Sequence, residues 1–120
     1  MNGRRIYIAG PMTGIENHNV DAFNEAAGRL RDEGWFVVNP AELSERLYGV
    51  LGSKEDIQEQ FNEYPVGDLA SAVLDIGLAA LSTCSAIYLL EGWENSRGSR
   101  MELRKALDHG LEVIQERKKA

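Results

Sequence analysis

Short apolar runs alternate along the chain with segments whose apolar residues recur at helical spacing. The runs predict strands at residues 5–9, 35–38, 86–90 and 111–114, of which the second and third are expected to be buried. Helical spacing predicts helices over residues 20–30, 66–81 and 103–107, with Gly34 and Gly110 closing the first and the last. The chain therefore has an alternating βα order.

Strands that alternate with helices pair in parallel through right-handed crossovers. The predicted fold is a single α/β domain over residues 1–120, because 120 residues suffice for one core. We expect a three-layer sandwich of flavodoxin or Rossmann type with a four- or five-stranded, mostly parallel sheet in the order 2-1-3-4. In such sheets ligands bind at the carboxyl ends of the strands, where the strand order reverses.

Two loops meet at that reversal, Gly10–Gly14 after the first strand and Gly92–Glu102 after the third. The second loop joins small residues and two arginines to a carboxylate at a helix start, which suits an anionic ligand beside a reactive acid. Two plainer interpretations stay open. Ser99 and Glu102 also fit a capping box, and the arginines can pair with nearby glutamates on a wet surface.

Charge and cysteine content exclude several classes of protein. A net charge of −6 and a pI near 4.9 argue against a general nucleic-acid or acidic-membrane surface, which needs a basic stripe. Cys84 is the only cysteine, so no intramolecular disulfide or cysteine-based zinc site is expected. The chain shows no signal peptide or spanning helix, and we expect a cytoplasmic protein.

Five segments together carry a resemblance to a known family. They are residues 7–12, 23–30, 39–42, 84–90 and 92–98. In combination they resemble the nucleoside 2-deoxyribosyltransferase-like superfamily, and most closely its small phage and bacterial members. The resemblance implies an enzyme that cleaves or transfers the N-glycosidic bond of a small nucleotide or nucleoside. It also implies a homodimer or higher homo-oligomer whose neighbours complete each site, with no cofactor and no metal.

The resemblance assigns roles to individual residues. Glu102 matches the nucleophile, which attacks C1′ to give a glycosyl ester that water or another base then opens. Tyr7 matches the tyrosine that orients this carboxylate, although a core aromatic is common on a buried strand. The remaining matches are substrate-binding positions: Gly10, Pro11, Met12, Asn39, Trp93, Ser96, Arg97, Gly98 and Ser99.

The substrate class depends on the spacing before the nucleophile. Ser96 and Gly98 stand before Glu102 as in the hydrolase branch of the superfamily that acts on 2′-deoxynucleoside 5′-monophosphates. Since transferases acting on free nucleosides need no phosphate pocket, 5′-monophosphates are the favoured substrate.

The chain departs from the family pattern at the second catalytic group. Gly77 stands where relatives carry an aspartate that helps the base to leave, and Asp75 is the candidate substitute. Restoring the acid by Gly77→Asp is therefore expected to raise the rate. Ser85 replaces a second frequent aspartate, and His18 is either an acid near neutral pH or a solvated loop residue.

Three functions from different classes follow from these observations. The first is a 2′-deoxynucleotide N-glycosidase or deoxyribosyltransferase. The second is a nucleotide-binding or sensing module that kept the pocket and lost the acid, and the third is a structural assembly subunit.

Residues 43–64 are either a mobile cover over the site or a solvated connecting helix.

Overall fold

The computed structural model describes residues 3–12, 19–42 and 76–116. Its labelled elements are β1 (Arg5–Ala9), α1 (Val20–Asp32), β2 (Phe36–Val38), β3 (Ala86–Leu89), the short 3₁₀ helix η2 (Trp93–Asn95), α5 (Arg97–Asp108) and β4 (Glu112–Gln115). Residues 40–42 and 76–81 are also helical. The expected cover at 43–64 lies outside the described residues, as do His18 and Asp75.

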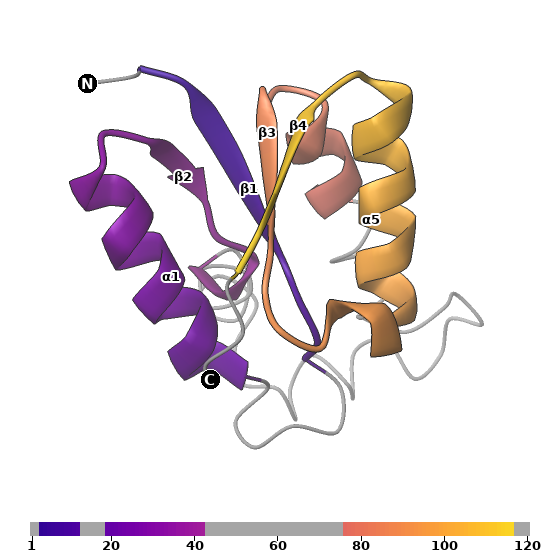
Figure 1. Cartoon of the computed structure of the whole chain (residues 1–120), viewed down its shortest axis with the longest axis horizontal. Helices are drawn as coiled ribbons and strands as arrows, with labels where there is room; N and C mark the ends of the chain where they lie inside the picture. Colours follow the sequence, from indigo (N-terminus) through magenta and orange to yellow (C-terminus); the bar gives the residue numbers. More distant parts are fainter. Residues whose placement is uncertain (1–2, 13–18, 43–75, 117–120) are drawn as a thin grey trace, which may run out of the picture.

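The four strands form one parallel sheet in the order β2-β1-β3-β4, which confirms the predicted order. Helices α1 and α5 lie on opposite sides of this sheet, so the α/β fold has three layers (Figure 1). Both glycines expected to end helices do so in the left-handed region, Gly34 at φ 94° and Gly110 at φ 73°. In the part of the chain that the structure describes, no helix has both the length and the apolar composition to cross a membrane.

Alternation along β1 divides the core into two halves. Ile6 and Ile8 pack with the buried face of α1, whereas Tyr7 and Ala9 face the other side together with Ala106 of α5. Strand β3 alternates in the same way, with Tyr88 toward the α1 half and Ile87 toward the α5 half. Because side chains alternate across a strand, the position of Tyr7 in the sequence fixes it under α5.

Strand β2 differs from the prediction of a buried strand. Phe36 is 65% exposed, and Val37 and Val38 are only partly buried. The reason is its place in the sheet, since β2 pairs with β1 and lies at the edge of the described strands. An apolar run of four residues predicts a strand but does not distinguish an edge from a centre.

Candidate active site

The loops after β1 and β3 lie against each other at the carboxyl ends of the strands. The amide of Leu90 donates to the carbonyl of Ala9 at 2.8 Å. A Cβ placed on Gly10 would lie 2.8 Å from the Cβ of Leu90, and one on Gly92 would lie 3.3 Å from Pro11 Cγ. Only glycine allows this approach at position 10, so the predicted meeting of the two loops is confirmed by the close packing of Gly10 against the Leu90 side chain.

Helix α5 begins beside these loops, at Arg97. Its N-cap is Ser96, whose Oγ accepts a hydrogen bond from the Ser99 amide at 3.2 Å. Ser99 is thus the third residue of the helix, and Glu102 lies in the second turn. The capping-box interpretation of Ser99 and Glu102 is therefore wrong, because the helix starts three residues earlier than that interpretation requires.

The carboxyl group of Glu102 is buried under α5 and is hydrogen-bonded to Tyr7. Glu102 is 7% exposed and Tyr7 is 1% exposed. Burial raises the pKa of Glu102 from 4.5 to about 7, although the hydrogen bond from Tyr7 opposes this shift. The Glu102 side chain therefore changes charge near neutral pH.

The phenol of Tyr7 keeps its proton throughout this range. Burial raises the pKa of Tyr7 well above its ordinary value of 10.0, and the nearby Glu102 carboxylate raises it further. Tyr7 is consequently the donor in its bond to Glu102, and the carboxylate is the acceptor. A buried acid held by a fixed donor has the features expected of a reactive carboxylate.

Comparison with known proteins places the chain in a family. Residues 4–115 match the family described as "Domain of unknown function (DUF4406)". The chain belongs to the DUF4406 family. No curated protein matches the sequence. A solved structure of a 2-deoxyribosyltransferase from the psychrotolerant bacterium Bacillus psychrosaccharolyticus has the same fold, with a TM-score of 0.58 and 20% identity over 92% of this chain and 70% of that chain.

Gly77 of this DUF4406 protein lies directly against the Tyr7–Glu102 pair. It is buried in the helical segment 76–81, and a Cβ placed there would overlap the Tyr7 hydroxyl and lie 3.4 Å from Glu102 Oε2. The position therefore has no room for an aspartate while Tyr7 and Glu102 keep their present places. This geometry reverses the expectation that Gly77→Asp would restore activity.

The side chain of Asn39 makes hydrogen bonds within the protein, in the turn after β2. It is 2% exposed, its Oδ1 accepts the Ala41 amide at 3.0 Å, and its Nδ2 donates to Asn24 Oδ1 at 3.0 Å. These bonds cap the helical turn that begins at Pro40. We therefore do not include Asn39, which the resemblance made a substrate-binding position, among the proposed substrate contacts.

The other predicted binding residues divide between the two halves of the core. Met12 packs against the α1 half of the core, whereas Trp93 packs against the α5 half, which includes Tyr7. Ser96 and Gly98 are partly buried, and Arg97 is exposed. No ion pair among the described residues involves Arg97 or Arg100, so the alternative in which these arginines pair with Glu94 and Glu102 is not observed.

Two further polar residues serve the fold, Asn19 beside the loop after β1 and Ser85 at the amino end of β3. Asn19 donates from Nδ2 to the carbonyl of Pro11 at 2.9 Å and adopts φ 63°, a left-handed conformation that asparagine tolerates. Sequence reasoning missed it, although an asparagine directly before a helical pattern was an available signal. Ser85, one of the departures from the family pattern, donates from Oγ to the Arg5 carbonyl at 3.1 Å.

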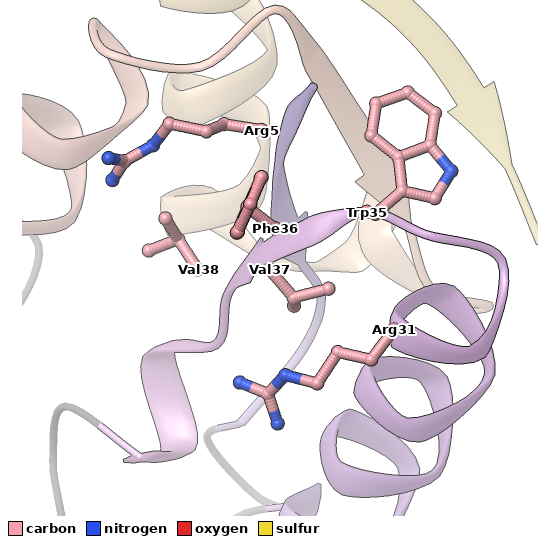
Figure 2. Close-up of a pocket in the computed structure, with 6 residues that line it drawn as sticks. All are labelled: Arg5, Arg31, Trp35, Phe36, Val37 and Val38. Carbon is pink, nitrogen blue, oxygen red and sulfur yellow. The ribbon is translucent and has the colours of Figure 1, made fainter. Parts of the chain in front are cut away.

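A hollow of about 420 Å³ lies elsewhere, beside the edge strand β2. Figure 2 shows its lining, which is Arg5, Arg31, Trp35, Phe36, Val37 and Val38. Arg31 is held there by Glu42 through two bonds of 2.7 and 2.9 Å. The hollow contains none of the predicted catalytic or binding residues. The described residues also hold no group of three or more metal-ligating side chains.

Proposed function

We propose that this DUF4406 protein cleaves the N-glycosidic bond of 2′-deoxynucleotides, with Glu102 as the nucleophile. The observation that carries the proposal is the buried Glu102 carboxyl, which accepts a hydrogen bond from Tyr7 of β1. The fold shared with a 2-deoxyribosyltransferase supports the same class of chemistry. A small-molecule nucleotide or nucleoside is thus the proposed substrate.

The proposed reaction has two displacements at C1′ of the sugar. The Glu102 carboxylate forms a bond to C1′, while the electron pair of the C1′–N bond passes to the leaving base. The base takes a proton from a general acid, for which Asp75 is the candidate from the sequence. Water or a second base then opens the glycosyl ester and restores the carboxylate. Tyr7 holds the carboxylate by its hydrogen bond.

The start of α5 supports a phosphate-bearing substrate. Ser96 accepts a bond with Oγ but keeps its own hydroxyl proton for a ligand, and the first amides of a helix have no partner within the helix. From Arg97 to Glu102 the helix rises about 7.5 Å, so one substrate can span both points with its sugar. Ser96, Arg97 and Gly98 are the proposed phosphate contacts.

Free base released from a panel of deoxynucleotides and deoxynucleosides tests the proposal. Chromatography should show release from the 5′-monophosphates, and exchange in the presence of a second base would identify transfer. At limiting substrate the rate should rise with pH through an apparent pKa near 7, because only the charged form of Glu102 attacks. Absence of release from every substrate, or a rate that falls over this range, would contradict the proposal.

Affinity separates nucleotides from nucleosides. If the start of α5 holds phosphate, a deoxynucleoside monophosphate should bind more tightly than its nucleoside by at least about 1.5 kcal/mol, the lower range for charge-assisted hydrogen bonds. Calorimetry at one ionic strength measures this difference, and Ser96→Ala should reduce it. Equal affinities would move the proposal to free nucleosides.

A nucleotide-binding or sensing module is the second candidate function. It is favoured by one observation, the glycine at position 77 packed where relatives carry an acid. The two candidates differ in the release assay, since a sensing module would bind the monophosphate without releasing base. For either function we propose a homodimer or higher homo-oligomer, to be measured by light scattering.

A further inference from the structure

The hydroxyl of Ser99 is the one buried side-chain polar atom without a hydrogen-bond partner in the part of the chain that the structure describes. Ser99 is 1% exposed and lies in the first turn of α5. Its backbone amide is satisfied by Ser96, so the missing partner concerns the side chain alone. A buried hydroxyl usually bonds a neighbouring carbonyl, side chain or water.

An unpartnered hydroxyl at this position costs stability. Alanine would remove the unsatisfied group, and it is also the better helix former. A serine that stability does not favour is the kind of residue expected at a functional site. A hydrogen bond made by this hydroxyl in another state of the site would account for the serine.

Ser99 and Glu102 share one face of α5. With Ala106 they are the buried residues of the helix, at spacings of three and four. Residues three apart on a helix have Cβ atoms about 5–6 Å apart, and helical side chains lean toward the N-terminus. Glu102 thus leans toward the turn that carries Ser99, and a rotation of its side chain brings the two groups within bonding distance.

Among the residues that the structure describes, the charged form of Glu102 has few donors besides Ser99. Tyr7 of β1 supplies one hydrogen bond. Cys84, in the turn before β3, contributes to the raised pKa of Tyr7 and does not contribute to that of Glu102. Residues 76–81 carry no ionisable side chain, and Glu94 of η2 and Glu112 of β4 are exposed and acidic. A carboxylate accepts several hydrogen bonds, so a second donor stabilises it.

We propose that Ser99 is a positioning residue whose hydroxyl donates a second hydrogen bond to the Glu102 carboxylate when that group becomes charged. This role rests on the proposed function, in which the charged carboxylate attacks C1′. Ser99 then holds the nucleophile from the N-terminal side, in addition to the bond from Tyr7. It lowers the free energy of the attacking form. This role replaces the substrate-binding role that the resemblance gave to Ser99, because Ser99 is buried in this structure.

The test compares Ser99→Ala with the wild-type protein by three measurements. The pKa of the Glu102 carboxyl, measured by carbon NMR titration of protein with labelled glutamate, should rise. The value of kcat should fall about tenfold, as expected for loss of a hydrogen bond to a charged group, with little change in KM. The unfolding temperature should stay the same or rise.

Two matched variants make the result specific. Tyr7→Phe removes the donor already seen and should move the Glu102 titration in the same direction. Ser82→Ala deletes the same atom from an exposed serine, whose hydroxyl bonds the Ala79 carbonyl, and should leave the titration unchanged. If the pKa of Glu102 is the same in Ser99→Ala as in the wild-type protein, the proposal is overturned, whatever the change in unfolding temperature.

The NMR titration also separates this inference from the proposed function. If Ser99→Ala shifts the titration while the wild-type protein releases no base from any substrate, Ser99 does bond the carboxylate and the proposed reaction is wrong. If base is released and the titration does not move, the reaction stands and the role of Ser99 is overturned.

Discussion

Replacing Glu102 with glutamine is expected to abolish turnover and, above pH 7, to stabilise the protein. Folding raises the pKa of Glu102 from 4.5 to about 7, so the folded state resists the charge that the unfolded chain accepts. The contribution of Glu102 to stability is complete below pH 4.5 and is lost as pH rises toward 7. At pH 8 the loss amounts to about 3 kcal/mol, and Glu102→Gln avoids it.

Urea unfolding at several pH values measures this effect. The stability advantage of Glu102→Gln over wild type should grow from about pH 4.5 and level off above pH 7, while base release is lost. Glu94→Gln, the same change at an exposed carboxylate of η2, is the control and should alter neither property. A variant with wild-type turnover would show that the nucleophile is another group. An advantage that does not depend on pH would show that the carboxyl is not buried as described.

Replacing Gly77 with aspartate is expected to destabilise the protein by at least about 3 kcal/mol and to remove activity. The new Cβ overlaps the Tyr7 hydroxyl, and Tyr7 is too buried to move aside without cost. The new carboxylate would also meet the Glu102 carboxylate in a buried site, where a second like charge is unfavourable.

Gly77→Ala isolates the steric part of this effect, and Gly28 provides the matched control. Gly28 also lies within a helix, but a Cβ placed there meets nothing within 4 Å. Gly28→Ala should therefore stabilise the protein by about 0.5–1 kcal/mol, the usual gain within a helix. Thermal unfolding and base release should be measured on all three variants. A well-folded Gly77→Asp protein with a faster rate would refute the packing described here.

The order and direction of the strands could be predicted because they depend on features that the sequence displays. Apolar runs separated by helical segments require crossovers, and crossovers impose parallel pairing. The same reasoning placed the loops of Gly10 and Gly92 together, since the strands before them are neighbours. Alternation within β1 further determines that Tyr7 faces one helix layer.

The errors concern properties that depend on three-dimensional contacts. Phe36 was expected to be buried because an apolar run does not reveal whether its strand lies at the centre or at the edge of a sheet. Ser99 looked like an N-cap because Ser96, three residues earlier, offers the same chemistry. Gly77 looked like a lost acid, whereas its hydrogen atom is what lets Tyr7 and Glu102 pack against the helical segment. The resemblance made Asn39 a substrate-binding position, and the sequence does not show that its side chain bonds Asn24.

The central claim is that the Glu102 carboxylate attacks C1′ and forms a glycosyl ester. The most direct measurement is the configuration of the product formed when methanol replaces water as the acceptor. Two displacements at C1′ retain the configuration of the substrate, whereas direct attack by the acceptor inverts it. Proton NMR should show the β-methyl 2-deoxyriboside 5-phosphate from a β-deoxynucleoside monophosphate with wild-type protein, and no product with Glu102→Gln. Formation of the α anomer, or the same product from both proteins, would contradict the account.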